Sequence, residues 1–508
     1  MITNAKSYYD FMSEITPADI YSGLLAHGMF SDKLPPVFTS KPFYDYVQTN
    51  SPTFQSKPHK YVYYENMRNI NVPRPLAIPN PFAYQRLCAF LRDIWPNLQV
   101  HFQNQTKTES HRVSRIHLRK MYQEDSLFQM NYGNWRVDGS PEVDILMTGK
   151  RYMVKADISS CFPSIYTHAL SWALATKEVA KVNRKNSKLW YNKIDALARK
   201  LTNDETHGLL IGPHVSNLLT ELILTCVDSK LQKWSYVRAI DDYTCYVDSH
   251  EDGQRFLTEL GAALREYELS LNHKKTEILE LPLAATSHWQ RKLNMLPLTT
   301  SYGKTDFPLT RAYLDHAIEL MDQNKGNAAI LKYAIKVLSE KDLTHNAKEY
   351  FTKTVLGLSL AYPYLVTMLD EYIFSKYCAN CSSHECIRIF AQRALQDGIT
   401  RRNYEQAAYA IFFAIKYGFQ LEGFDIAAAI QSADSIFMLM SYYYVHKEGL
   451  TNELAQLITS AQQYASDLIT FDEYWIYLYE ILPKTDLQED WRTLKEKGIS
   501  FVKPLSDW

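Results

Sequence analysis

The clearest hydropathy pattern of the chain lies at residues 236–248, where β-branched and aromatic residues flank two adjacent acids. The stretch reads Tyr-Val-Arg-Ala-Ile-Asp-Asp-Tyr-Thr-Cys-Tyr-Val-Asp. Strands favour Val, Ile and Tyr and disfavour Asp, so the pattern predicts a hairpin whose tight turn presents the carboxylates of Asp241 and Asp242. An Asx turn in a surface hairpin has the same pattern, and the surrounding chain has to decide between the two interpretations.

The elements around this hairpin predict an α+β layout. Residues 151–157 read as a strand that ends at Asp157, and a turn then leads into a helix opened by Pro163. The remaining elements are a glycine-rich turn and amphipathic helix over 207–231, a helix over about 251–268, and a short strand that ends at residue 279. The order strand, helix, helix, hairpin, helix, strand is typical of an α+β palm.

Beyond about residue 285 the pattern changes to amphipathic helices with short polar connections. Examples are residues 313–321, 327–338, 347–360 and 407–417. Successive antiparallel helices of this length are typical of an α-solenoid or HEAT-like array, although no repeated sequence signature accompanies them. We therefore expect two domains, with an N-terminal extension, fingers and palm over 1–285 and an all-α domain over 286–508.

Composition adds little to this picture. The chain has 508 residues with 55 Lys and Arg against 56 Asp and Glu, so any phosphate-binding surface must be local. No apolar run approaches the roughly 18 residues of a membrane span, and the first residues lack a basic segment followed by an apolar one. A cytoplasmic location without membrane association is the expectation. The cysteines are scattered and odd in number, at 7, which argues against a disulfide framework.

One cluster of cysteine and histidine leaves two interpretations open. The potential zinc ligands are Cys378, Cys381, His384 and Cys386. Their spacing is more compressed than in common zinc knuckles, and reduced residues at a helix junction are the simpler interpretation.

Three acids form the candidate catalytic centre. Asp157 lies at a strand end, where α/β sites are commonly built, and adjacent carboxylates such as Asp241 and Asp242 raise one another's pKa unless a cation compensates. Carboxylate oxygens are the ligands that Mg²⁺ accepts beside substrate phosphates. Arg74 lies on an extended, Pro-rich segment from which it could reach into a cleft.

These motifs, in this order, resemble those of reverse transcriptases, over roughly residues 70–285. The matching segments are Arg74-Pro-Leu-Ala-Ile-Pro, Lys155-Ala-Asp-Ile, His207-Gly-Leu-Leu-Ile-Gly-Pro-His-Val-Ser-Asn-Leu, Ile240-Asp-Asp and Asn272-His-Lys-Lys-Thr-Glu. Three positions depart from the family pattern. Ala239 stands where an aromatic residue is expected, His207 replaces a Gln that monitors the nucleotide and template pair, and Gly212 replaces a Ser.

The resemblance implies a role for each matched residue. Two Mg²⁺ ions, with Mn²⁺ as an alternative, would be held by Asp157, Asp241 and Asp242. The other implied roles are triphosphate binding by Arg74, exclusion of a 2′-hydroxyl by Phe162, packing under the incoming nucleotide by His207 and Gly208, and assistance of pyrophosphate departure by Lys275, with Lys274 as the alternative.

The long helical region directly after the palm resembles the abortive-infection reverse transcriptases of the AbiK-like group, in their smaller prophage-encoded branch. Segments Ser164-Ile-Tyr-Thr-His and Asp204-Glu-Thr-His-Gly also look like that group. The resemblance implies a homo-oligomer that polymerises deoxynucleoside triphosphates without a template in defence against phage. The single-stranded DNA product would be attached to a protein tyrosine. Tyr8 ranks first among the candidates Tyr8, Tyr9, Tyr21, Tyr44 and Tyr46, because a terminal segment could reach the active site.

Three other interpretations remain open at this level. A templated reverse transcriptase of the retron or intron type would carry the same palm motifs. The helical array could instead sense a phage component or drive assembly, with polymerisation incidental. A catalytically inactive palm could also be retained as a scaffold, although all three acids and the aromatic Phe162 are present.

Overall fold

The catalytic candidates lie on a four-stranded antiparallel sheet. The computed structural model describes residues 7–69, 72–115, 142–283, 287–378 and 381–508. The strands are β3 (Tyr152–Asp157), β4 (Ser235–Ala239), β5 (Asp242–Val247) and β6 (Glu277–Glu280), in the order β4-β5-β3-β6. The tight turn predicted between residues 239 and 242 joins β4 to β5, and the strand predicted to end at Asp157 is β3.

Helices cover this sheet and complete the α+β body. Helix α12 (His250–Arg265) packs against β3 and β5, and Gly253 lies so close that a Cβ there would meet Val154 and Ile278 at 3.1–3.2 Å. The other helices of this body are α1 (Tyr8–Ser13), α2 (Pro17–Leu25), α3 (Lys41–Asn50), α4 (Pro81–Asp93), α5 (Trp95–Thr106), α6 (Glu142–Met147), α7 (Cys161–Ser164), α8 (His168–Ala175), α9 (Lys177–Val182), α10 (Trp190–Arg199), η2 (Lys200–Thr202) and α11 (His214–Asp228).

The helix expected to open at Pro163 begins two residues earlier, so that prediction was wrong in detail. Helix α7 starts at Cys161 and spans a single turn, with Pro163 at its third position. Proline lacks only an N–H that the first turn of a helix leaves unpaired in any case, so it is tolerated there without marking the start.

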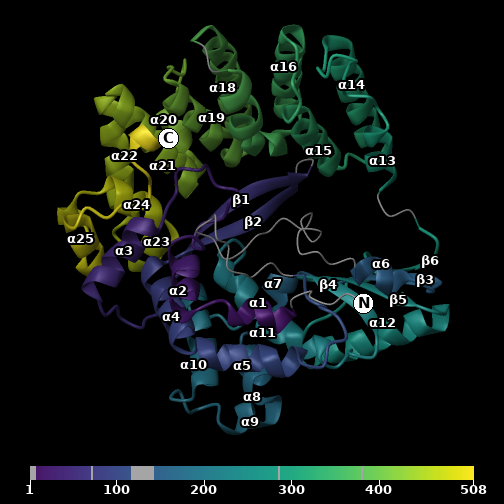
Figure 1. The fold of residues 1–508 in the computed structure, drawn as a ribbon. Coiled ribbons are helices and arrows are strands. Elements are labelled where there is room, and N and C mark those ends of the chain that lie inside the picture. The colour runs from purple at the N-terminus through teal and green to yellow at the C-terminus, as the bar shows by residue number, and fades with distance from the viewer. Residues whose placement is uncertain (1–6, 70–71, 116–141, 284–286, 379–380) are drawn as a thin grey trace.

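A two-stranded ribbon projects from the body toward the C-terminal helices (Figure 1). Strands β1 (Tyr61–Asn69) and β2 (Val72–Pro79) pair antiparallel, with Asn66 opposite Arg74. Three prolines, at positions 73, 75 and 79, fall in β2. Proline cannot donate to a ladder, so a ribbon of two edge strands is the sheet form that accommodates them.

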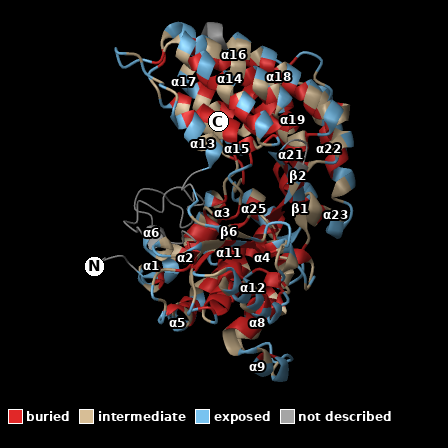
Figure 2. Cartoon of the chain, turned by 90° about the vertical axis from the view of Figure 1, so that its right-hand side faces the viewer, coloured by how far each residue is buried: buried red, intermediate tan, exposed pale blue. Residues whose placement is uncertain are grey.

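The C-terminal region is helical throughout its described residues apart from isolated bridges. Its helices are α13 (His288–Asn294), α14 (Phe307–Gln323), α15 (Ala328–Ser339), α16 (His345–Ala361), η3 (Pro363–Met368), η4 (Asp370–Phe374), α17 (Ser375–Tyr377), α18 (Cys381–Arg401), α19 (Tyr404–Tyr417), α20 (Ile426–Ser432), α21 (Ser435–Glu448), α22 (Thr451–Tyr464), α23 (Leu468–Glu473), α24 (Trp475–Ile481), η5 (Lys484–Asp486), α25 (Glu489–Glu496) and η6 (Leu505–Asp507). They form an arc over the α+β body (Figures 1 and 2). The largely helical region is confirmed, and a HEAT-like repeat within it stays a prediction.

The end of the arc packs back onto the N-terminal segment. The Thr39 N–H donates to the Phe501 carbonyl at 2.9 Å, and the Lys503 N–H donates to the Val37 carbonyl at 2.8 Å. Aromatic rings join the two regions, with Phe501 5.5 Å from Phe43 between ring centroids. Val37, Phe43 and Phe501 are buried, so the arc and the body share part of one core.

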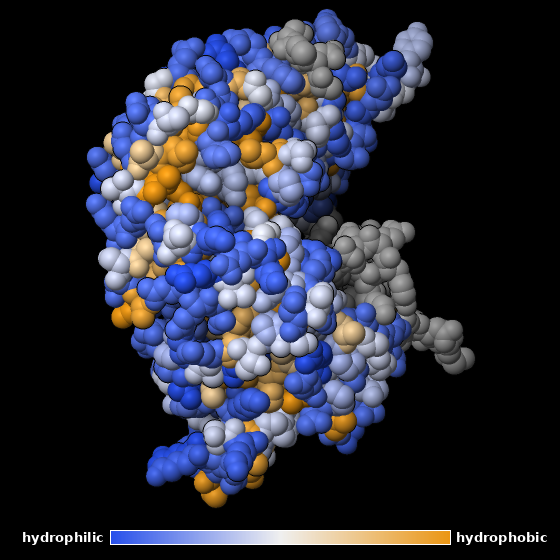
Figure 3. Space-filling view, turned by 90° about the vertical axis from the view of Figure 1, so that its left-hand side faces the viewer, coloured by the Kyte–Doolittle hydropathy of each residue, from blue (hydrophilic) through white to orange (hydrophobic). Residues whose placement is uncertain are grey.

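The surface carries hydrophobic residues in separate groups, and the face in Figure 3 is largely hydrophilic. Exposed large hydrophobic residues include Val182, Met295, Tyr302 and Leu468. Among the helices of the described residues, none combines the length and the apolar composition that a membrane crossing needs.

Candidate active site

The strand register brings the three candidate acids together at one end of the sheet. Asp157 is the last residue of β3 and pairs with Asp242, the first residue of β5. Asp241 lies in the turn just before, and its carbonyl accepts the Ile158 N–H at 3.1 Å. Asp157 is buried at 4% exposure, Asp241 is half-buried and Asp242 is exposed. The carboxylates therefore form a graded cluster that opens toward solvent.

The pKa values of the hairpin acids reflect this crowding. Burial raises the pKa of Asp242 to about 6, and the neighbouring Asp241 and Asp157 carboxylates add to the shift. Burial and Asp157 also raise the pKa of Asp241, whereas Lys275 and Arg74 oppose that shift. Adjacent carboxylates that repel one another in a partly desolvated site are stabilised by a bound cation.

A lysine and an asparagine fix Asp157. The Lys275 ammonium lies 2.7 Å from Asp157 Oδ2, and the Asn272 amide donates to Asp157 Oδ1 at 2.9 Å. The Asn272 backbone N–H also donates to the Asp157 carbonyl at 2.7 Å. This geometry favours Lys275 over Lys274 as the lysine of the site.

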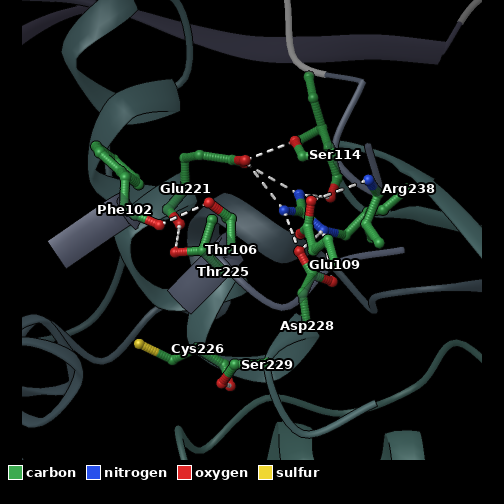
Figure 4. A network of polar contacts seen from close by, with 12 residues as sticks. Phe102, Thr106, Glu109, Ser114, Glu221, Thr225, Cys226, Asp228, Ser229 and Arg238 are labelled. Carbon is green, nitrogen blue, oxygen red and sulfur yellow. Dashed lines mark hydrogen bonds and ion pairs between the residues drawn. The ribbon is translucent and has the colours of Figure 1, made fainter. Parts of the chain in front are cut away.

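A buried arginine supports the β4–β5 hairpin, and Figure 4 shows the polar network around it. Arg238 on β4 is fully buried, and its guanidinium donates to Glu221 at 3.0 and 3.1 Å and to Asp228 at 2.6 and 2.9 Å. The same guanidinium donates to the Ile240 carbonyl at 3.0 Å. Ile240 has φ +57°, a conformation that β-branched residues rarely adopt, so Arg238 stabilises the strained turn that presents Asp241.

The partners of Arg238 come from two other segments. Glu221 and Asp228 lie on α11, and Ser114 donates to Glu221 Oε1 at 2.5 Å. The Arg238 N–H donates to the Val113 carbonyl at 2.9 Å. We call Ser114, Glu221, Asp228 and Arg238 the arginine network. Through the arginine network, helix α11 and the segment before residue 116 are both hydrogen-bonded to the β4–β5 hairpin.

In the arginine network, one guanidinium pairs with two carboxylates, those of Glu221 and Asp228. Burial raises the pKa of Asp228, against the opposing effect of Arg238. The nearby Glu109 is half-buried; burial raises its pKa to about 8, and Asp228 adds to the shift. Glu109 therefore binds a proton in the folded protein at neutral pH, which limits the excess negative charge around the guanidinium.

A cavity of about 1080 Å³ is lined by residues of the α+β body and of the helical arc. Arg74 and Phe162 line it together, with Lys336 and Lys503 on the arc side. Gly212 also lines it, with φ +127°, and a Cβ there would lie 3.1 Å from the Ala77 carbonyl oxygen. The departure from the family's serine at position 212 thus coincides with a backbone conformation that only glycine adopts readily.

His207 and Gly208 lie on the loop that faces helix α7. The Gly208 N–H donates to the Ile165 carbonyl at 2.9 Å, with φ +91° at Gly208. His207 is exposed, and its ring lies 5.0 Å from the ring of Tyr166. The imidazole of His207 therefore lies beside an aromatic ring. Two residues further along the loop, the Leu209 N–H donates to the Phe162 carbonyl.

The structure places Tyr8 away from solvent. Tyr8 is 3% exposed on α1, its ring lies 5.7 Å from Phe102, and burial together with Glu221 raises its pKa well above the usual range. A priming hydroxyl must reach the nucleotide, so priming from Tyr8 requires α1 to leave the body. Of the other candidates, Tyr21 is also buried, whereas Tyr9, Tyr44 and Tyr46 are partly exposed.

The zinc hypothesis falls partly outside the described residues. The side chain of Cys381 is among those that the structure does not describe. Cys378 is buried, and the ring of His384 lies 5.5 Å from that of Tyr417. A zinc site at these positions stays a prediction.

Sequence reasoning missed the arginine network. A single Arg in the alternating apolar pattern before Asp241, and two acids in an otherwise apolar stretch of α11, were its signals. Charged residues are almost never fully buried without a partner, so the three positions together indicate an internal ion pair.

The antiparallel sheet presents one acid at a strand end and two at a neighbouring hairpin. Residues 74–300 match the family model of reverse transcriptases, described as RNA-dependent DNA polymerases. This part of the chain is therefore similar to a reverse-transcriptase domain.

No curated protein sequence matched the chain. Solved structures with similarity include apo telomerase from Candida tropicalis, at 12% identity and a TM-score of 0.33 over 83% of this chain and 71% of that one. The C-terminally truncated form has 14% identity and a TM-score of 0.28, over 48% and 55% of the two chains. Telomerase from Candida albicans with a telomeric RNA fragment has 12% identity and a TM-score of 0.28, over 69% and 64%. The chain thus spans 55% of the length of the truncated form.

The residues fit a divalent metal in chemical type. In the described part of the chain, no three His, Cys, Asp or Glu side chains are arranged to hold a metal ion. At Asp157, Lys275 and Asn272 hydrogen-bond to the two carboxylate oxygens. Burial and the neighbouring carboxylates raise the pKa of Asp242, and a cation bound beside these acids would relieve their repulsion.

Replacing Arg238 is expected to destabilise the protein strongly. Arg238→Met leaves two buried carboxylates unpaired, which should lower the free energy of unfolding by about 3–5 kcal/mol. Urea unfolding followed by circular dichroism measures the loss. Arg255→Met removes an exposed arginine that pairs with Asp252 and should cost less than about 1 kcal/mol. Equal effects of the two substitutions would contradict the role of the arginine network.

Glu109 should make stability depend on pH. Its folded-state pKa of about 8 lies above the ordinary value of 4.5, so its contribution to stability is full at low pH and is lost as pH rises from about 4.5 through 8. Glu109→Gln should therefore lose less stability than the wild type between pH 5.5 and 8.5, measured as the urea midpoint. The exposed Glu496→Gln is the control and should follow the wild type. Parallel curves for wild type and Glu109→Gln would refute the proposed protonation.

Proposed function

We propose that the protein is a DNA polymerase that adds deoxynucleotides by phosphoryl transfer from deoxynucleoside triphosphates. The observation that carries the proposal is the convergence of Asp157, Asp241 and Asp242 beside Lys275. A reverse-transcriptase domain over residues 74–300 supports the same reaction class.

The acids and the cationic side chains have different roles in the proposed reaction. Divalent ions held by Asp157, Asp241 and Asp242 would supply charge neutralisation and activation of the attacking hydroxyl. Lys275 is already within hydrogen-bond distance of Asp157, and once displaced it can donate a proton to the departing pyrophosphate. Arg74 lines the cavity and lowers the pKa of Asp241 against the effect of burial, and its bidentate fork can bind phosphate oxygens.

The aromatic Phe162 supports a preference for deoxynucleotides. It lines the same cavity as Arg74, where a ring beside the sugar would clash with a 2′-hydroxyl. Its backbone carbonyl accepts the Leu209 N–H at 2.9 Å, so the loop after Gly208 holds the main chain that carries the ring.

Synthesis without a template is the finer part of the proposal. Its support is the three departures from the templated pattern: Ala239 lacks the aromatic ring expected near the primer end, His207 replaces the Gln that monitors base pairing, and Gly212 replaces a Ser. We propose that a protein tyrosine provides the first hydroxyl and that the product strand stays attached to the protein. Tyr8 would serve this role after α1 detaches.

Defence against phage by abortive infection, and assembly into a homo-oligomer, complete the proposal. They rest on the resemblance of the helical region and of segments 164–168 and 204–208 to the AbiK-like group. In this view the HEAT-like domain over 286–508 is part of the defence protein, with residues 1–285 as the catalytic unit.

Incubation with labelled deoxynucleotides and Mg²⁺, with and without a primer-template, tests the proposal. Long DNA that forms without template and leaves the protein only after protease digestion is the expected result. Asp241→Asn should lower incorporation by about 100-fold or more, since metal ligands contribute several kcal/mol. The matched control is Asp248→Asn, an exposed acid paired with Lys150 at the other end of the same strand region, which should leave incorporation unchanged.

Each outcome of this assay has a definite meaning. Synthesis only with an added primer-template would overturn the untemplated proposal in favour of a retron-like or intron-like enzyme. Absence of incorporation in both conditions would overturn the polymerase proposal itself. Mass spectrometry of the nucleotide-linked peptide identifies the tyrosine, and linkage elsewhere would exclude Tyr8.

A further inference from the structure

A carboxylate of the helical arc contacts the strand that carries the cross-strand partner of Arg74. Glu405 lies in the first turn of α19, far from the palm in sequence. Its Oε1 accepts the Asn66 side-chain amide at 2.5 Å, and its Oε2 accepts the Met67 N–H at 2.8 Å. Both oxygens of one side chain are thus engaged by adjacent residues of β1.

The two β1 residues are placed to transmit this contact to the active site. Asn66 is the residue directly opposite Arg74 in the β1–β2 register. Asn66 and Arg74 line the same cavity, together with Phe162. Directly opposed residues of an antiparallel ladder have Cα atoms only about 4.5–5.5 Å apart, so a contact that fixes Asn66 also restricts where the backbone of Arg74 can lie.

The ribbon needs such support because it has only two strands. An isolated two-stranded ribbon is marginally stable in water. The arc holds the other end of the ribbon as well, since Asp472 on α23 accepts from His59 Nδ1 at 2.9 Å and from the Asn80 amide at 3.0 Å. Carboxylates from the arc therefore contact the ribbon at its base and near Arg74.

The surroundings of Glu405 indicate a strong contact. Burial raises the pKa of Glu405 to about 7, whereas the hydrogen bonds from Met67 and Asn66 and the charges of Lys332 on α15 and of Lys33 oppose that shift and favour the carboxylate. Hydrogen bonds to a charged group in a partly desolvated site are about twice as strong as neutral ones. Glu405 can therefore hold β1 in one register with respect to the arc.

We propose that Glu405 is a positioning residue of the active site, which acts through Asn66 to hold Arg74 where it can bind the triphosphate. The inference rests on the proposed polymerase function and extends it, because it makes the helical arc a structural part of the nucleotide site. It predicts that loss of Glu405 impairs nucleotide binding and leaves the chemical step nearly intact.

A double-mutant cycle tests this proposal. Glu405→Ala should raise the KM for deoxynucleotide by roughly tenfold, which corresponds to loss of a charge-assisted hydrogen bond, with kcat changed less than about threefold. Arg74→Ala should raise the KM as well. The combination should match Arg74→Ala alone, because a residue that acts only through Arg74 has nothing to add once Arg74 is gone.

The control is Glu422→Ala, which removes an exposed carboxylate of the same arc that pairs with Arg388 and should leave the KM unchanged. If Glu405→Ala does not fold, Asn66→Ala provides the same cycle, because it removes the donor and leaves the Met67 contact. Multiplicative effects of the two substitutions, or a fall in kcat with unchanged KM, would overturn the inference. A wild-type protein without any incorporation would instead overturn the proposed function, so the two failures are distinguishable.

Discussion

The buried ion pair of Arg238 with Glu221 and Asp228 is the interaction on which the site depends. The guanidinium is fully buried and also binds the carbonyl of Ile240, the residue with positive φ that immediately precedes Asp241. A buried ion pair is not in itself a source of net stability, but removal of one partner is costly. The arrangement therefore specifies one conformation of the hairpin. Any change that released Arg238 would free both the turn and the register of Asp242 against Asp157.

The second constraint is the way the helical arc closes on the body. The chain end hydrogen-bonds to residues 37–39, and Asp472 and Glu405 contact the ribbon that carries Arg74. A ribbon of two strands cannot hold an arginine in a fixed position by itself. The arc supplies further contacts, so the three acids and Arg74 are positioned by different regions. Their mutual geometry then depends on packing between the two regions.

The local sequence predicted the strand that ends at Asp157 and the hairpin, because β-branched alternation and turn chemistry are short-range signals. The resemblance to reverse transcriptases implied that the three acids meet. The local sequence also predicted the helical C-terminal region, because the hydropathy period of an amphipathic helix can be read from its own sequence. The contacts of Arg238 and Glu405 escaped prediction because each joins positions far apart in the chain, and a single sequence does not indicate which buried charges meet. The burial of Tyr8 escaped prediction for the same reason. A residue near the start of the chain is expected to be exposed, but Tyr8 packs against Phe102, a residue far from it in sequence.

We propose that Asp157, Asp241 and Asp242 form a site for two divalent ions. Electron paramagnetic resonance of Mn²⁺ titrated into the protein with a non-hydrolysable deoxynucleotide tests it directly. Two ions bound about 3.5–4 Å apart, as in two-metal sites, should give a stoichiometry of two and a spin-coupled spectrum, and Asp241→Asn should abolish the coupling. A single uncoupled ion, or a spectrum unaffected by Asp241→Asn, would contradict the account.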